Sequence, residues 1–176
     1  MQPRIFFVTG VVGAGKTTLL ELLRSELGPG YEAHDFDERG VPDDVDVEWG
    51  AAERRHWLSV GLANLEKGIS TVICGFALPD HGDDRDLVKF ILLDLNETTL
   101  RERLMKRYAD PANVANLWRM RRMTVEESLR ENLGSISWLR GLCTAHGATI
   151  VDTAGLTPEQ TAERVRDWIR RACQDV

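Results

Sequence analysis

The sequence has few cysteines and no long apolar segment. Its three cysteines, Cys74, Cys143 and Cys173, are widely spaced, which fits neither a disulfide framework nor a zinc-site pattern. The longest purely apolar runs have about four residues, whereas a membrane-spanning helix needs about 20. The first strand-like run begins by Ile5, so we expect no signal peptide ahead of it. These features predict a cytoplasmic protein that has no membrane partner.

Basic residues are also in the minority. The chain has 22 lysines and arginines against 28 aspartates and glutamates, a formal net charge of −6. This balance gives no electrostatic basis for binding duplex nucleic acid or an anionic membrane. No internal repeat, low-complexity tract or linker interrupts the 176 residues, a length that suits one domain with a full core. We therefore predict a single domain over residues 1–176.

What the sequence does contain is a regular alternation of short apolar runs and helical patterns. The predicted strands are residues 5–9, 31–36, 71–76, 89–95 and 148–151, and the predicted helices are residues 16–27, 48–66 and 97–108 and two that open at Thr124 and Thr157. The last two helices each begin with a capping box. Strands that alternate with helices indicate right-handed crossovers and a parallel sheet covered on both faces. We expect an α/β fold in three layers, a five-stranded parallel sheet flanked by helices, with ligands at the carboxyl ends of the strands.

The most informative motif joins the first strand to the first helix. Residues 10–18 read Gly-Val-Val-Gly-Ala-Gly-Lys-Thr-Thr, which matches GxxxxGK[ST] in its strand–loop–helix context. Glycines let the backbone turn its N–H groups inward toward a polyphosphate, and the following helix adds the positive end of its dipole. The motif predicts a nucleoside triphosphate site in which Lys16 reaches the β- and γ-phosphates and Thr17 ligates Mg²⁺. The predicted nucleotide-binding residues are Gly10, Val12, Gly13, Ala14, Gly15, Lys16, Thr17 and Thr18.

A second motif, Asp35-Phe36-Asp37, follows the second predicted strand. Alternate residues of a strand share a face, so both carboxylates project the same way at the sheet edge that holds the phosphate loop. Phosphoryl transfer needs little more than a cation at the phosphates and a carboxylate that orients or deprotonates the attacking hydroxyl. A solvated acidic loop would explain the pair on its own, but the neighbouring phosphate loop favours a catalytic role.

With these two motifs the chain resembles the small P-loop kinases: shikimate kinase, gluconate kinase and, more distantly, the nucleoside monophosphate kinases. The resemblance covers nearly the whole chain in its order of elements. It implies a P-loop NTPase fold with a short lid, and an ATP- and Mg²⁺-dependent phosphotransferase that acts on a hydroxyl of a small-molecule substrate. By this likeness Asp35 lies near Mg²⁺, and Asp37 holds the acceptor hydroxyl as the base. In other relatives the first carboxylate is the base, so both roles stay open.

The resemblance also implies residues on the substrate side. Shikimate kinases carry a carboxylate-binding arginine on the second helix, where this chain has Arg54 and Arg55. Either is a candidate for an anionic group of the substrate, although a solvated helix face would also account for them. Gly75 stands where relatives place a glycine near the substrate, and Phe76 is expected either beside the pocket or in the core. The single glycine here, against three in shikimate kinases, argues against shikimate itself.

On the nucleotide side, residues 100–107 match the LxxRLxxR helix of these kinases. The match implies that Arg103 lies against the adenine and Arg107 near the phosphates, with ordinary surface charge as the alternative. Residues 108–123 take the place of the lid, from which Arg119 or Arg122 is expected to stabilise the transferring phosphoryl group.

The segment after the last predicted strand is the remaining candidate on this side. Thr153, Ala154 and Gly155 are expected to contact the adenine through their backbone, as the corresponding loop does in small kinases. Asp152 to Gly155 also spells the DxxG of GTPases, but no guanine-recognition motif follows it. We therefore reject a GTPase.

Two rival functions remain open from the sequence. One is a nucleoside or nucleotide kinase, in which Trp49, Trp57 and Phe76 would stack a base. The other is a nucleotide-binding regulatory module with weak ATPase activity, for which the paired aspartates would have no use. A Walker B aspartate is missing after residues 72–74, which argues against motor-type ATPases. The sequence leaves the acceptor, the choice of ATP or GTP and the oligomeric state undetermined.

Overall fold

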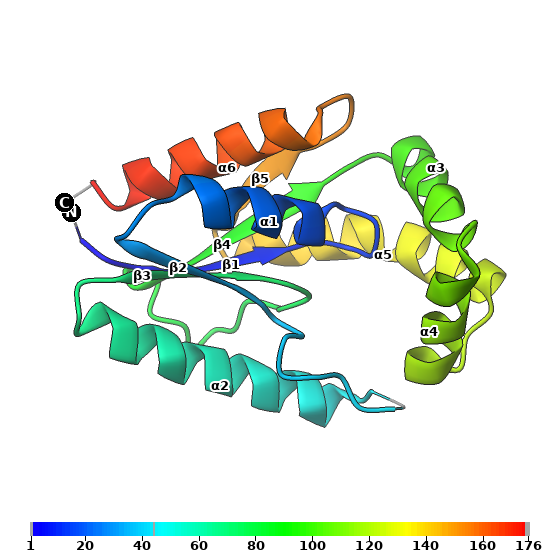
Figure 1. The fold of residues 1–176 in the computed structure, drawn as a ribbon, viewed down its shortest axis with the longest axis horizontal. Helices are drawn as coiled ribbons and strands as arrows, with labels where there is room; N and C mark the ends of the chain where they lie inside the picture. The colour runs from blue at the N-terminus through cyan, green and yellow to red at the C-terminus, as the bar shows by residue number, and fades with distance from the viewer. Residues whose placement is uncertain (1, 44, 175–176) are drawn as a thin grey trace.

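The computed structural model describes residues 2–43 and 45–174, which form one five-stranded parallel sheet (Figure 1). The strands are β1 (Ile5–Thr9), β2 (Tyr31–Asp35), β3 (Ser70–Cys74), β4 (Val88–Asp94) and β5 (Thr149–Asp152). They are arranged in the order β2-β3-β1-β4-β5, and every neighbouring pair is parallel. The first strand therefore lies in the middle of the sheet.

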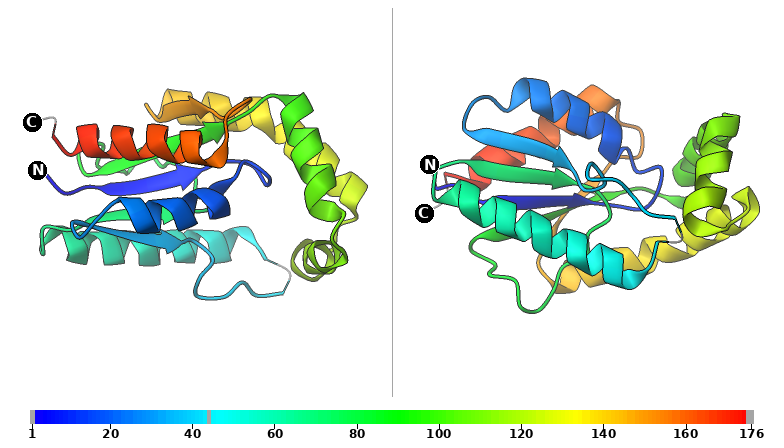
Figure 2. Two further views of the ribbon diagram at one scale, coloured as in Figure 1. Left: turned by 45° about the horizontal axis from the view of Figure 1, so that its top comes forward. Right: turned by 60° about the horizontal axis from the view of Figure 1, so that its bottom comes forward.

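Helices cover both faces of this sheet. The helices are α1 (Lys16–Glu26), α2 (Val47–Leu65), α3 (Glu97–Tyr108), α4 (Pro111–Arg121), α5 (Val125–Ala145) and α6 (Pro158–Ala172). α1 packs against α6 on one face, and α2 and α5 lie on the other (Figure 2). The fold is thus α/β in three layers with a parallel five-stranded sheet, which confirms the predicted fold class.

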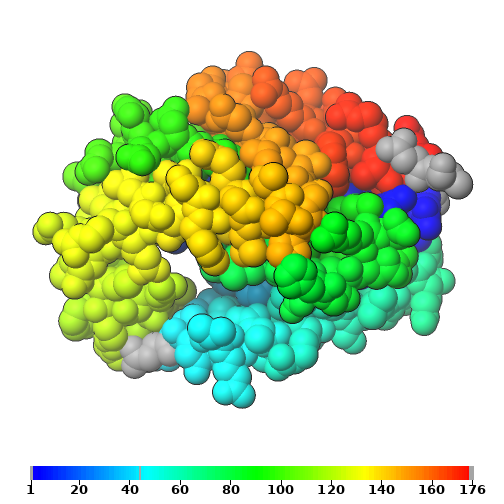
Figure 3. All heavy atoms as spheres, turned by 180° about the vertical axis from the view of Figure 1, so that it is seen from behind, coloured from blue at the N-terminus to red at the C-terminus, as the bar shows by residue number. Residues whose placement is uncertain are grey.

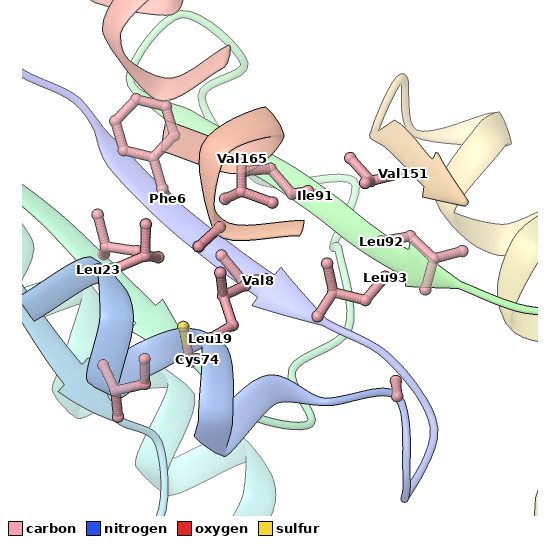
Figure 4. Packing of buried hydrophobic residues seen from close by; sticks show 14 of the residues in the cluster. Phe6, Val8, Leu19, Leu23, Cys74, Ile91, Leu92, Leu93, Val151 and Val165 are labelled. Atoms are coloured by element: carbon pink, nitrogen blue, oxygen red, sulfur yellow. The ribbon is translucent and has the colours of Figure 1, made fainter. Parts of the chain in front are cut away.

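The core is divided by β1, whose five residues are all buried. Phe6 and Val8 point into the cluster formed with α1 and α6, where Figure 4 shows Leu19, Leu23 and Val165 around them. Ile5 and Phe7 belong to the second cluster, on the side of α2. Burial on both faces anchors the strand, and this gives the loop that follows Thr9 a rigid base.

Both predicted capping boxes are present. The Thr124 side chain accepts a hydrogen bond from the Glu127 backbone N–H at the start of α5, and Thr157 does the same with Gln160 at the start of α6. Within the part of the chain that the structure describes, no helix combines the length and apolar character needed to cross a bilayer.

An arm of helices stands beyond the carboxyl ends of the strands (Figure 1). It consists of α3, α4 and the first part of α5, and it includes the predicted lid segment, residues 108–123. Most of that segment is the helix α4, which the sequence analysis did not predict. α4 begins at the N-cap Asp110 and ends at Arg122, whose φ of 51° is left-handed. In the space-filling view, an opening separates this arm from the start of α2 (Figure 3).

Candidate active site

The loop of residues 10–15 leaves β1 and turns directly into α1. A Cβ atom on Gly10 would lie 2.8 Å from the Leu93 carbonyl oxygen and 2.9 Å from the Ala14 Cβ, so the approach of neighbouring backbone excludes a side chain. Gly15 has a φ of 103° as the N-cap of α1, a conformation that glycine adopts without strain. The two glycines thus permit the tight turn that the predicted phosphate cradle requires.

Lys16 folds back over this loop. Its Nζ donates hydrogen bonds to the carbonyl oxygens of Gly10 at 2.6 Å and Val11 at 2.9 Å. Burial of the amine lowers the pKa of Lys16 to about 8, although the charges of Asp37 and Asp35 act in the opposite direction. The amine therefore lies inside the loop and close to both aspartates.

The two aspartates occupy the turn that follows β2. Asp35 is the last residue of the strand, and its Oδ1 accepts a hydrogen bond from the Asp37 backbone N–H at 2.9 Å. Glu38 Oε2 accepts from the Asp35 N–H at 3.1 Å, which fixes the turn further. Partial burial and the charge of Asp35 raise the pKa of Asp37, while Lys16 offsets part of that effect. The structure thus brings Lys16, Asp35 and Asp37 together, as the shared edge of the parallel sheet predicts.

Glu53 is a further acidic residue here, and the sequence analysis did not select it. Only 7% of Glu53 is exposed, and its Oε1 accepts a hydrogen bond from Arg39 Nη1 at 3.2 Å. Its charge also helps to raise the pKa of Asp37. One turn further along α2, Trp57 Nε1 donates to the Phe36 carbonyl oxygen at 3.0 Å. The inner face of α2 therefore lies against the turn that carries the aspartates.

The same orientation of α2 keeps its two arginines out of the site. Arg54 donates from Nε to the Leu78 carbonyl oxygen at 3.1 Å and pairs through Nη2 with Asp83, in the loop between β3 and β4. Arg55 is exposed, roughly opposite the buried Glu53 on a helix that turns about 100° per residue. Neither arginine is placed to hold an anionic group of the substrate, so we do not retain Arg54 or Arg55 as substrate-binding residues.

Gly75 and Phe76 follow β3 at the same edge of the sheet. A Cβ on Gly75 would lie 2.0 Å from the Phe36 Cβ, and the Gly75 N–H donates to the Val8 carbonyl oxygen at 3.0 Å. The absence of a side chain thus lets the ends of β2 and β3 pack together. Phe76 is 51% exposed and not part of the core. Its place in the pocket remains a prediction.

Arg103 of α3 joins the phosphate loop to the segment after β5. Its Nη1 donates to the Ala14 carbonyl oxygen and to Thr153 Oγ1, both at 3.2 Å, and its Nη2 donates to the Thr153 carbonyl oxygen at 3.1 Å. The Ala154 N–H donates to Asp152 Oδ1 at 2.9 Å, and Gly155 closes the turn with a φ of 73°. The predicted adenine-side residues therefore meet beside the phosphate loop.

Three arginines in or near the predicted lid have different surroundings. Arg107 lies near enough to Lys16 for its charge to contribute to the lowered Lys16 pKa. Arg119 donates to Asp43 Oδ1 at 2.7 Å and to the Val41 carbonyl oxygen at 3.5 Å, which rests α4 on the segment after β2. Arg122 lies at the end of α4. Arg119 would have to leave Asp43 before it could reach a phosphoryl group.

The phosphate loop is also held by α5, through contacts that no sequence motif indicated. The Val12 N–H donates to Asn132 Oδ1 at 3.0 Å, and Asn132 Nδ2 donates to the Ser128 carbonyl oxygen at 2.8 Å. The Ser128 hydroxyl is hydrogen-bonded to the Tyr108 hydroxyl at 2.8 Å. This chain, which we call the loop–lid brace (Val12, Asn132, Ser128 and Tyr108), connects the loop to both helices that flank α4.

The oxygen donors near the loop fit Mg²⁺. Thr17 is exposed at the start of α1, next to Lys16, and Asp35 lies close enough to influence the Lys16 amine. Mg²⁺ prefers oxygen ligands and is held by one or two protein groups together with phosphates and water. In residues 2–43 and 45–174, no group of three or more His, Cys, Asp or Glu side chains is gathered to hold a metal ion.

A cavity lies elsewhere in the described part of the chain. It measures about 230 Å³ and is lined by residues around the start of β4 and the end of α5, among them Arg85, Lys89 and His146. This is the edge where the strands begin, whereas the loop and the aspartates lie where β1 and β2 end. The candidate site is therefore identified by the proximity of Lys16, Asp35 and Asp37 and not by the size of a cavity.

Comparison with known proteins gives matches only at the level of structure. No protein-family model matches the chain, and a search of curated proteins finds no match. A sugar kinase from Janibacter sp. is 24% identical, with a TM-score of 0.60 over 98% of this chain and 97% of its own. A gluconokinase from Sinorhizobium meliloti is 19% identical, with a TM-score of 0.57 over 98% and 95% of the two chains.

A third solved structure, a protein from Chloroflexus aurantiacus provisionally described as a kinase, is 21% identical. Its TM-score is 0.64 over 98% of this chain and 99% of its own. At such identities a likeness establishes the fold and not the activity. The chain therefore shares the fold of these three structures over nearly its whole length, and the predicted resemblance to small P-loop kinases is confirmed at the level of the fold.

Proposed function

We propose that the protein is an ATP-dependent phosphotransferase that moves the γ-phosphoryl group to a hydroxyl of a small metabolite. The observation that carries this proposal is the position of the Lys16 amine, which is desolvated inside the phosphate loop and close to both Asp37 and Asp35. A nucleotide-binding loop and a candidate base thus share one edge of the sheet. The sugar kinase and gluconokinase among the structural neighbours support the same class of reaction.

In the proposed mechanism, the loop N–H groups and Lys16 bind the triphosphate, and Asp37 or Asp35 accepts the proton of the acceptor hydroxyl. The hydroxyl oxygen forms a bond to the γ-phosphorus while the bond to the β-bridging oxygen breaks, which releases ADP. The raised pKa of Asp37 suits a group that accepts a proton. Bound Mg²⁺, held by Thr17 and by Asp35 through water, would neutralise charge on the phosphates.

The remaining residues assist by positioning and by charge. Arg103 holds the phosphate loop against the adenine-side segment, and Arg107 adds positive charge beside Lys16. Arg119 or Arg122 would stabilise the transferring group after the lid closes. Catalysis would then consist mainly of alignment and electrostatic stabilisation, with closure excluding water from the phosphate.

The two rival functions receive less support. Trp57 donates its ring N–H to the Phe36 carbonyl oxygen, and Trp49 packs edge-to-face on the Phe36 ring with ring centroids 6.2 Å apart, so both are engaged in packing. Of the three aromatic residues considered for stacking a base, Phe76 is the one that is mainly exposed. A regulatory module would need nucleotide binding but no base for a second substrate, so the pair of aspartates beside the phosphate loop supports a phosphotransferase better than a regulatory module.

A coupled assay of ADP release across a panel of hydroxyl-bearing metabolites tests the proposal. We expect turnover that depends on an acceptor. Asp37→Asn should abolish this turnover while MgATP binding by calorimetry stays within about threefold, and the exposed Glu163→Gln on α6 serves as the control. Loss of nucleotide affinity alone in Asp37→Asn would contradict the role as base. Nucleotide binding without acceptor-dependent turnover would favour the regulatory module.

A further inference from the structure

The acceptor side of the candidate site is lined by carboxylates. Asp35 and Asp37 come from the turn after β2, and Glu53 comes from the inner face of α2. Arg39, two residues after Asp37, donates to Glu53 Oε1 at 3.2 Å. One turn after Glu53, Trp57 donates to the Phe36 carbonyl oxygen at 3.0 Å, so this part of α2 lies against the turn that carries both aspartates. An acceptor hydroxyl held by Asp37 would therefore enter a site in which three carboxylates face two cations, Lys16 and Arg39.

The arginines around this side are engaged by other carboxylates. Arg54 pairs with Asp83 and is only 16% exposed, while Arg119 pairs with Asp43 on the lid side. Arg39 donates to Glu53 Oε1 and so offsets part of the charge of that residue. Arg55, the other predicted anion-binding residue, is on the outer face of α2. The geometry thus offers little to bind a carboxylate or phosphate on the acceptor.

Glu53 has a second property that points to a ligand. The residue is 7% exposed, and its Oε2 has no hydrogen-bond partner among the described residues. A buried carboxylate oxygen without a donor is uncommon and costs stability, because it has lost water and gained nothing in exchange. A ligand that carries several O–H or N–H donors would supply the missing partner after a small adjustment of the side chains.

We propose that the acceptor is a donor-rich polyol without negative charge, either a neutral sugar or an amino alcohol, and that Glu53 determines this specificity. One hydroxyl of the acceptor faces Asp37 for phosphorylation, and a second hydroxyl or an ammonium group donates to Glu53 Oε2. Sugar acids and phosphorylated sugars are rejected because they would place a negative charge among three carboxylates. This inference rests on the proposed phosphotransferase function and narrows its substrate class.

Acceptors that share a carbon skeleton and differ in charge test the proposal. Glucose, glucosamine and gluconate form one such set, and xylitol, xylose and xylonate form another. We expect the preferred acceptor to be a neutral or cationic member, with kcat/KM at least tenfold below it for the carboxylate of the same skeleton. A carboxylate as the preferred acceptor would overturn the proposal while leaving the phosphotransferase function intact.

Two variants that change the charge near Asp37 in opposite directions test the role of Glu53. Glu53→Gln should reduce the discrimination between the neutral and carboxylate members at least fivefold. Arg39→Met should preserve or increase the discrimination, because it removes the cation that faces Glu53. Glu163→Gln should leave it unchanged. Equal discrimination in wild type and Glu53→Gln would refute the role of Glu53.

A measurement that needs no acceptor separates this inference from the proposed function. Carbon-detected NMR can follow the titration of the Asp37 carboxyl group in the free protein, which also verifies that each variant is folded. The Asp37 pKa should be lower in Glu53→Gln and higher in Arg39→Met than in wild type, and an unchanged pKa in Glu53→Gln would contradict the inference. If MgATP binds and no acceptor of any charge is phosphorylated, the phosphotransferase proposal fails, and with it the proposed substrate class.

Discussion

The ammonium group of Lys16 is buried among the carbonyl oxygens of its own loop, and its pKa of about 8 is well below the usual 10.5. A triphosphate would bring negative charge to the amine and stabilise its protonated form. Above pH 8 the amine of the free protein is mostly neutral, whereas the amine in the complex keeps its proton. Binding must therefore take up a proton in this range, and affinity must fall as the pH rises from about 8 toward 10.

We accordingly predict that calorimetry at pH 9, in two buffers of different ionisation enthalpy, will report uptake of up to one proton per MgATP bound. At pH 7 the uptake should be close to zero. Lys16→Met should weaken binding at least tenfold and abolish the uptake, while Lys67→Met, an exposed lysine, should change neither. Proton uptake that persists in Lys16→Met would assign the titration to another group.

We also predict that a side chain at Gly75 destabilises the fold. A methyl group there would overlap the Phe36 side chain at its Cβ, where no flexible atom can move away. We expect Gly75→Ala to lower the free energy of unfolding by at least about 2 kcal/mol. Gly141→Ala is the matched control, since its added Cβ would meet nothing within 4 Å on α5. Urea denaturation should show this control to be stabilised by roughly 0.5–1 kcal/mol.

The residues of the site were predictable where a short motif sets the backbone. Lys16, Asp35 and Asp37 come together because parallel strands place their carboxyl ends at one edge. Glu53 was not selected, although it precedes Trp57 by one turn on the buried face of α2. Its partner Arg39 is distant in sequence. The periodicity of α2 shows which residues face the sheet, but it does not distinguish a residue that lines a ligand site from one that is packed in the core. The orientation of α2 about its own axis also directs Arg54 toward the loop between β3 and β4 and leaves Arg55 exposed.

At the scale of elements, the loop–lid brace couples the phosphate loop to the helices that carry the lid. Asn132 Oδ1 is the acceptor for the Val12 N–H, and loss of one such hydrogen bond costs about 1 kcal/mol. We predict that Asn132→Ala will raise the KM for ATP about fivefold while kcat changes less than twofold. Steady-state kinetics of ADP release provide the measurement.

A neighbouring residue on α5 supplies the control for this prediction. The Ser135 hydroxyl donates to the Glu131 carbonyl oxygen and takes no part in the brace. Ser135→Ala should therefore match the wild type in both constants. If Asn132→Ala lowers kcat and leaves the KM for ATP unchanged, the brace acts on the chemical step or the lid and not on the conformation of the loop.

The elements themselves followed from apolar periodicity and capping residues, and most boundaries agree within two residues. α4 is the exception, because no residue of this helix is buried and it therefore has no apolar stripe to detect. The N-cap Asp110 followed by Pro111 was the available signal. Helices that contact the rest of a protein mainly through polar side chains leave little trace in hydropathy.

For the whole molecule, the layout predicts an uneven distribution of stability. β1 is buried on both faces in the middle of the sheet, whereas α4 lies at the end of the arm with no buried residue. We expect hydrogen exchange by mass spectrometry to be slowest in β1 and fastest in α4 for the free protein. Addition of MgATP should slow exchange in residues 10–18 and, through the brace, in the first turns of α5.

A uniform response of all segments to MgATP would contradict this prediction, as would protection of α4 equal to that of β1.

The overall fold class could be predicted from the alternation of strands and helices along the chain. The order β2-β3-β1-β4-β5 could not, because alternation specifies that strands are parallel and not which strands are neighbours. Long-range pairings such as that of β1 with β4 depend on side-chain packing that one sequence does not display.

The two ends of the described chain are joined by a hydrogen bond from the Gln2 N–H to the Cys173 carbonyl oxygen at 2.8 Å. They lie at the edge where β1 begins, opposite the helical arm (Figure 1). A surface tether or a fluorescent fusion attached at either end would therefore lie on the side of the molecule away from the helical arm. Immobilised in this way, the protein would leave α4, the main part of the predicted lid, facing the solution.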